Sequence, residues 1–173
     1  MHCRKPALSF FSVLAASAIL TFTPPRDAWA GHVTAGALTV QDVWARPSIG
    51  NAPNGVVYLK ILNKGDKSER LVGASANVAK HVGLHATVME DGIMKMRNAA
   101  KGIAVPAKGA VELKSGGFHV MLMGLTQKLI PGENFDLTLT FERQGDVKIP
   151  VEIKKLGYKD PSNASGAMAP HKH

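Results

Sequence analysis

The sequence predicts an all-β fold, an antiparallel β-sandwich, over the part of the chain from about Leu38 to Lys155. Residues 135–142 (FDLTLTFE) and 147–154 (VKIPVEIK) alternate apolar and polar side chains without a fault, as strands with one buried face do. Pro150 lies on the polar side of the second segment and cannot donate a ladder hydrogen bond, which favours an edge strand. Turn signals recur at the spacing expected of a sandwich; they are Asn63-Lys64-Gly65-Asp66, Asp91-Gly92, Lys108-Gly109, Gly116-Gly117, Pro131-Gly132 and Gln144-Gly145.

The first 30 of the 173 residues have the features of a secretory signal peptide. Arg4 and Lys5 precede an apolar segment at 7–22, and residues 28–30 (AWA) supply the small side chains of a cleavage site. A membrane anchor is the alternative, but this segment is short for a bilayer core, which needs about 20 residues. We therefore expect residues 1–30 to be removed, residues 31–158 to form the folded domain, and residues 159–173 to be a disordered, polar tail.

Composition excludes several classes of protein. The only cysteine is Cys3 in the leader, so the expected mature chain has no disulfide, no thiol redox centre, no zinc finger and no blue-copper site. The net charge is +8 for the whole chain, and +6 without the leader's three basic residues and one acidic residue. Its lysines are scattered, which argues against nucleic acid and favours solubility or attraction to an acidic partner. There is no second apolar run of membrane-spanning length, so we expect no membrane span after cleavage.

Five of the seven methionines, and three histidines, gather between residues 81 and 123. His119 and Met121 are separated by one residue, so on a strand they point to the same face. Met123 would share that face, which lies opposite the residues expected to face the core. Those core-facing candidates are Phe118, Val120 and Leu122. Methionines repeated on an outer face are unusual unless they bind something.

A hairpin is predicted around Asp91-Gly92, a strong two-residue turn signal. In that register Thr87 pairs with Met96, and His85 lies diagonal to Met96 on the same face, a separation that long side chains can bridge. Lys95 and Arg97 would then fall on the face that carries apolar residues. A hairpin whose tip overhangs the sandwich would remove this conflict.

These patterns single out His85, Met96, His119 and Met121 as candidate ligands of a soft metal ion. Thioether sulfur favours Cu(I) and is a poor ligand for zinc, calcium or magnesium. A set of two imidazoles and two thioethers suits holding an ion rather than activating water, so an enzyme that uses the two histidines on zinc is a weaker alternative. Any one of these residues alone would more simply be a core methionine or a surface histidine.

The flanking residues resemble the PCuAC family of periplasmic copper chaperones. The family pattern of a His, ten residues, a Met, about twenty-two residues and a His-x-Met matches His85, Met96, His119 and Met121. Further likeness runs from about Leu38 to Ile153; it includes residues 42–47 (DVWARP), 71–74 (LVGA), 89–97 (MEDGIMKMR) and 116–125 (GGFHVMLMGL).

The resemblance implies a cupredoxin-like, Greek-key β-sandwich without a cupredoxin's cysteine. It implies that those four side chains bind Cu(I) near the surface of a non-enzymatic, periplasmic protein. It also implies delivery of copper to the dinuclear centre of cytochrome c oxidase, with the copper-bearing subunit and a thiol-bearing assembly factor as partners. An exported copper-buffering or resistance protein that never meets the oxidase is the alternative.

Two further places could bind copper. Met168, His171 and His173 form a short version of the Met/His-rich tails found in some family members, and the two histidines could take Cu(II). An ordinary disordered tail is the alternative reading. His32, which cleavage would place second, could act with the new amino terminus in the same way.

Overall fold

The computed structural model describes residues 32–159, which form eleven β-strands and no helix. The strands are β1 (Val33–Ala35), β2 (Leu38–Ala45), β3 (Asn54–Asn63), β4 (Glu69–Ala76), β5 (Ala79–Glu90), β6 (Ile93–Asn98), β7 (Ile103–Val105), β8 (Gly109–Leu113), β9 (Phe118–Leu125), β10 (Asn134–Phe141) and β11 (Gly145–Ile153). No helix that could cross a membrane occurs in this part of the chain. The expected leader, and the tail from residue 160 onward, lie outside the described residues.

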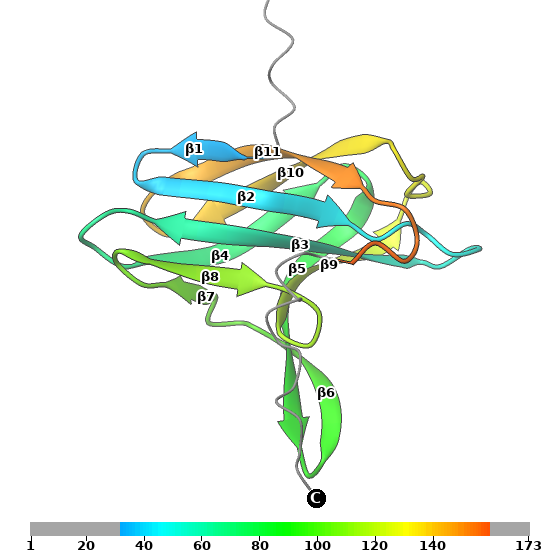
Figure 1. Cartoon of the computed structure of the whole chain (residues 1–173). Coiled ribbons are helices and arrows are strands. Elements are labelled where there is room, and N and C mark those ends of the chain that lie inside the picture. The colour runs from blue at the N-terminus through cyan, green and yellow to red at the C-terminus, as the bar shows by residue number, and fades with distance from the viewer. Residues whose placement is uncertain (1–31, 160–173) are drawn as a thin grey trace, which may run out of the picture.

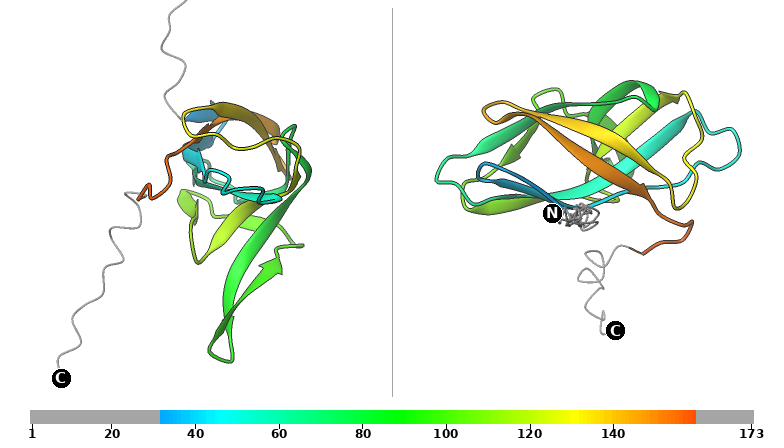
Figure 2. Two further views of the ribbon diagram at one scale, coloured as in Figure 1. Left: turned by 90° about the vertical axis from the view of Figure 1, so that its right-hand side faces the viewer. Right: turned by 90° about the horizontal axis from the view of Figure 1, so that it is seen from above.

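All eleven strands belong to one mixed sheet that curls around a common core without closing (Figures 1 and 2). The strand order is β6-β5-β9-β8-β3-β2-β11-β10-β4-β7, β1 pairs with β2, and β9 also pairs with β3. Nine ladders are antiparallel, whereas β11–β2 and β8–β9 are short parallel ladders. The predicted all-β architecture is confirmed, with a sheet that is mixed rather than wholly antiparallel.

The alternating segments form β10 and β11, as predicted. Their apolar side chains are buried and their polar ones are exposed or half-buried; the buried set is Phe135, Leu137, Leu139, Phe141, Val147, Ile149, Val151 and Ile153. The edge-strand prediction for Pro150 was wrong, because β11 lies between β10 and β2. The sheet tolerates Pro150 because the parallel ladder to β2 begins only at Glu152, so no ladder bond to β2 is required of the proline.

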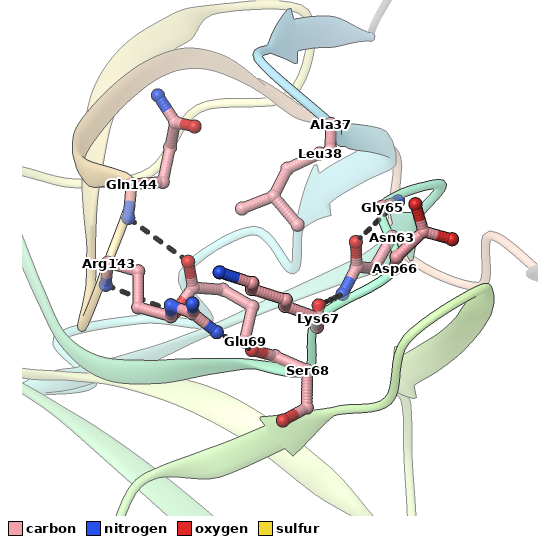
Figure 3. A pocket seen from close by; sticks show the side chains of 10 residues that line it. All are labelled: Ala37, Leu38, Asn63, Gly65, Asp66, Lys67, Ser68, Glu69, Arg143 and Gln144. Carbon is pink, nitrogen blue, oxygen red and sulfur yellow. Dashed lines mark hydrogen bonds between the residues drawn. The ribbon is translucent and has the colours of Figure 1, made fainter.

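Each predicted turn signal falls between two strands. The turn between β10 and β11 is hydrogen-bonded to Glu69, a buried carboxylate at the start of β4 (Figure 3). Glu69 Oε1 accepts hydrogen bonds from the backbone N–H groups of Arg70 and Arg143, at 2.8 and 3.1 Å, and Oε2 accepts one from Gln144 at 3.0 Å. Arg143 and Gln144 belong to the turn between β10 and β11, so one side chain ties that turn to β4.

The two halves of β3 pair with different strands along the same edge. Residues 59–63 of β3 pair with β8, and residues 54–57 pair with β9. The turn at 114–117 carries the chain from one neighbour to the other. The far edge of β9 then pairs with β5, whose outer half continues into the β5–β6 hairpin. This hairpin projects from the body of the sheet, which is the arrangement that removes the conflict over Lys95 and Arg97 (Figures 1 and 2).

Candidate metal-binding site

The centre of the candidate site is a cross-strand pair of histidines. His85 of β5 and His119 of β9 are directly opposite in the antiparallel ladder, and their ring centroids are 5.9 Å apart with a 38° angle between the planes. The neighbouring positions Leu84, Val120 and Leu122 are buried in the core, so the histidines lie on the other face of the sheet. Because metal–imidazole bonds are about 2 Å long, rings at this separation can share one ion.

Both rings present a buried nitrogen that has no hydrogen-bond partner, His85 Nδ1 and His119 Nε2. His119 is only 3% exposed, and its Nδ1 lies 3.1 Å from the carbonyl oxygen of Gly117. A neutral imidazole that donates from Nδ1 keeps its lone pair on Nε2, which is the arrangement that orients a metal-binding histidine. An unpartnered buried nitrogen is costly, and a metal ion would remove that cost.

Burial lowers the pKa of His85 below its ordinary value of 6.5, and the nearby His119 lowers it further. Both effects disfavour the protonated ring, because it would be partly desolvated and close to a second imidazole. The neutral, metal-binding form of His85 is therefore favoured at neutral pH.

The two predicted thioethers approach from different elements. Met121 is two residues after His119 on β9, on the same face, and is half-buried opposite Gly83. Met96 lies on β6, paired with Thr87 and therefore diagonal to His85, in the register that the turn signal predicted. The structure thus places His85, His119 and Met121 on adjoining ladder positions, whereas Met96, 51% exposed, lies on the projecting hairpin.

The polar face of the hairpin resolves the conflict seen in the sequence. Arg97 Nε and Nη2 donate to the two carboxylate oxygens of Glu90, at 3.0 and 2.6 Å, and Lys95 Nζ lies 3.2 Å from the same carboxylate. These three side chains lie on the face opposite the methionines, beyond the edge of the core. The hydrogen bonds from Arg97 and Lys95 lower the pKa of Glu90, while desolvation opposes them.

One core prediction was wrong, and one neighbour of the site was given too little weight. Phe118 is 37% exposed rather than buried, because it is the first residue of β9 and pairs with Ala86 where the hairpin leaves the sheet. Met123 shares the face of His119 and Met121, as the i, i+2 spacing predicted, but sequence reasoning left it outside the ligand set. Its cross-strand partner is His81. The signal that could have included Met123 was the repetition of methionine at that spacing.

Within residues 32–159, no three His, Cys, Asp or Glu side chains are grouped so as to hold a metal ion. The thioethers on the same face come from Met121, two residues after His119 on β9, and from Met96, diagonal to His85 across the hairpin. This donor set is neutral and soft, and in physical terms it matches a monovalent copper ion better than a hard divalent one.

A family model described as "Putative lipoprotein LpqE-like" matches residues 38–153, almost the entire sheet. The chain belongs to this LpqE-like family, which is the PCuAC-like family. Two curated relatives also match. The putative lipoprotein Lxx21020 of Leifsonia xyli is 34% identical over 94 residues, 54% of this chain, and the uncharacterized protein RP573 of Rickettsia prowazekii is 29% identical over 113 residues, 64% of this chain. The match spans 57% and 62% of the lengths of those two proteins.

Solved structures of PCuAC domains have the same fold. The apo PCuAC domain from PmoF1 is 25% identical with a TM-score of 0.62, covering 72% of this chain and 98% of that one. The Cu(I) form of DR1885 from Deinococcus radiodurans is 26% identical with a TM-score of 0.54, covering 75% and 85%. The copper-bound PCuAC domain from PmoF2, 22% identical with a TM-score of 0.61, covers 72% and 97% and matches in fold. The predicted cupredoxin-like β fold is confirmed for this PCuAC-like chain.

Proposed function

We propose that this protein is a copper chaperone, an exported carrier that binds one Cu(I) ion through His85, Met96, His119 and Met121. The observation that carries the proposal is the pair of facing imidazoles, each with a buried, unpartnered nitrogen, beside thioethers on the same face. Membership of the PCuAC-like family, and the solved copper-bound forms of DR1885 and PmoF2, support it.

The chemistry of the site favours carrying over catalysis. Neutral ligands leave a single positive charge when Cu(I) binds, which limits the cost of placing the ion in a partly buried site. Glu90, the carboxylate of the same hairpin, is engaged by Arg97 and Lys95 on the opposite face, so it is not placed to act as a base on a metal-bound water. Thioethers also grip less tightly than thiolates, which suits an ion that must leave again.

The recipient and compartment form the finer part of the proposal. The signal-like leader and the lipoprotein names of the family and of one relative support export, and we place the mature chain in the periplasm. We propose that it delivers copper for the dinuclear centre of cytochrome c oxidase, with the oxidase subunit and a thiol-bearing assembly factor as partners. Loss of the gene should then lower oxidase activity at limiting copper. Lower copper tolerance with unchanged oxidase activity would favour the buffering alternative.

The direct test of the site is a Cu(I) titration of the mature protein under anaerobic, reducing conditions, against a chromophoric Cu(I) chelator. One tightly bound ion per chain is expected, with sulfur and nitrogen neighbours in its X-ray absorption spectrum. His119→Asn and Met121→Leu should each weaken binding about tenfold or more, which corresponds to about 1.4 kcal/mol. Met89→Leu is the matched control, because Met89 is an exposed thioether at the far end of the same hairpin. Unchanged binding in both site variants would refute the site.

A further inference from the structure

The outer face of the β5–β6 hairpin carries a second pair of soft donors, nearer the tip than the four proposed ligands. Met89 of β5 and Met94 of β6 are directly opposite in the ladder. They are 65% and 59% exposed, so an ion in the solvent can reach both. Two residues further from the tip, Met96 pairs with Thr87 on the same face. The proposed ligand set leaves this outer pair without a role.

The turn determines which rows of this ladder bring their side chains close together. Asp91 and Gly92 both have a positive φ, 53° and 75°, as the two central residues of a type I′ turn do. In such a hairpin the pair next to the turn is hydrogen-bonded, and the following row is not. Met89 and Met94 occupy that following row. They therefore form the closer kind of cross-strand pair.

The side chain of Met94 extends across β5, the strand that carries Met89. Its terminal methyl carbon lies 3.8 Å from the position that a Cβ atom of Gly116 would occupy. Gly116 belongs to the turn on the far side of β5 from β6, where the carbonyl oxygen of Gly117 accepts a hydrogen bond from Thr87 N–H at 3.0 Å. Met94 therefore lies over β5, on the face that Met89 shares, rather than turning away from it.

Two thioethers in this arrangement match the size of a Cu(I) ion held between two sulfurs. The Cβ atoms of a directly opposite pair are about 4.5–5.5 Å apart. A metal–sulfur bond is about 2.3 Å long, so two such bonds end to end span about 4.6 Å. Thioether sulfur selects Cu(I) over hard cations, and the unbranched methionine side chain adapts easily to an ion. An exposed pair of neutral donors without an imidazole should bind the ion weakly.

We propose that Met89 and Met94 form a second, weaker Cu(I) site at the hairpin tip, where the ion binds before it passes to the site at His85 and His119. This inference rests on the proposed function. Met96, the outermost ligand of that site, is two residues from Met94 along β6, about 7 Å at the rise of a strand. Each transfer replaces one neutral ligand by another, so copper stays Cu(I) and no redox partner is needed.

The test is a Cu(I) titration of the mature protein with isotope-labelled methionine methyl groups, followed by NMR, with affinities measured by chelator competition. The first equivalent should shift the methyl signals of Met96 and Met121. A second equivalent, weaker by about tenfold or more, should shift those of Met89 and Met94. Met89→Leu/Met94→Leu conserves volume and apolar surface but removes both sulfurs. This double variant should lose the second step, keep the affinity of the first, and take up Cu(I) more slowly from a chelator complex.

Ile93→Ala is the matched control, because Ile93 is 61% exposed at the same tip but lies on the opposite face and has no sulfur. It should leave both binding steps and the uptake rate unchanged. Circular dichroism confirms that each variant is folded.

A second step that persists in the Met89→Leu/Met94→Leu protein, or a wild-type protein that binds only one Cu(I), would overturn the second site. Unchanged uptake in the double variant would overturn its place before the inner site, and is the result expected if the apolar tip serves only to dock a partner. A wild-type protein whose only binding step depends on Met89 and Met94 would instead overturn the proposed function and leave the second site standing.

Discussion

The two histidines show how a β-ladder can prepare a metal site from single residues. A backbone carbonyl, that of Gly117, holds the ring of His119 from one side, and cross-strand pairing fixes His85 opposite it. Neither ring needs a charged partner for this orientation. The two unpartnered nitrogens lower the stability of the apo protein, and in the proposed function they are the atoms that bind the ion.

At this scale, the lowered pKa of His85 gives the first prediction. In an NMR titration of the apo protein, His85 should protonate below its ordinary value of 6.5. His119→Asn should raise the value only in part, because burial is the larger cause and the histidine neighbour the smaller one. A folded-state pKa below the unfolded one means that the apo protein loses stability as the pH falls below about 6.5. A His85 that titrates above 6.5 would contradict this account.

Gly83 provides a second prediction for a single residue. Gly83→Ala adds a methyl group 3.1 Å from His85 Nε2, so the imidazole must move by a few tenths of an ångström, whereas the methyl carbon of Met123, at 3.4 Å, is in ordinary contact. We expect a folded protein with weaker Cu(I) binding, measured by chelator competition. Gly73→Ala is the control, because its added methyl would meet only Thr140, at 3.7 Å or more. Equal affinities in the two variants would argue against close packing above Gly83.

Among the elements, the β5–β6 hairpin carries exposed ion pairs in addition to its backbone ladder, and we expect them to add modestly to its local stability. Glu90→Gln removes the charge that attracts Arg97 and Lys95, so hydrogen exchange in β6 should become faster and Cu(I) affinity should fall, with the global unfolding midpoint unchanged. Acid should act in the same way. Since the pKa of Glu90 is lowered from 4.5, its contribution is present above that pH and is lost as the pH falls through the folded-state value. Glu112→Gln is the control, because Glu112 is similarly paired with Lys60 and Lys114 but lies on β8.

A further prediction concerns the tie between β4 and the β10–β11 turn. Glu69→Gln replaces a carboxylate that accepts three backbone hydrogen bonds, and one oxygen becomes an NH₂ group facing a donor. The expected loss is about 1–3 kcal/mol in the free energy of unfolding, measured by urea titration. Glu133→Gln, at an exposed position, should be close to neutral. Cu(I) binding should persist in both variants, because Glu69 lies outside the site.

The sequence predicts an element well when the residues that determine it are close together in the chain. The alternation in β10 and β11, the Asp91-Gly92 hairpin and its register follow from residues that are near one another in the chain. The neighbours of β11 do not, since only the assembled sheet shows that Pro150 lies before the start of the β2 ladder. The exposure of Phe118 likewise depends on where the hairpin leaves the sheet.

The site shows the same division. The shared face of His119, Met121 and Met123 follows from strand periodicity, and the diagonal position of Met96 follows from the turn. The opposition of His85 and His119 depends on the β5–β9 ladder, which joins segments more than thirty residues apart. The pattern of spacings could indicate it only through the family resemblance, and the close approach above Gly83 required coordinates.

At the scale of the whole molecule, the Cu(I) site should be independent of the C-terminal tail. The last described residues are anchored to the sheet, with the rings of Tyr158 and Trp44 5.0 Å apart in an edge-on contact. A chain truncated after Lys159 should therefore fold and bind Cu(I) with unchanged affinity and stoichiometry. If His171 and His173 bind Cu(II), as proposed for the tail, truncation should remove that weaker binding, measured by electron paramagnetic resonance. A truncated chain with reduced Cu(I) stoichiometry would place part of the site in the tail.

Because β8 and β9 pair with consecutive parts of β3, the length of the turn that joins them is restricted. One residue added between β8 and β9 would shift the register of β9 against β5 by one position and exchange the two faces of β9. His119 would then point into the hydrophobic core, and Val120 would take its place on the outer face. Extra residues at the exposed hairpin tip can instead lengthen the loop while β6 keeps its register against β5, so that Met96 stays on the face of His85. Natural variants and engineered insertions should therefore accumulate at residues 91–92 and be absent from 114–117.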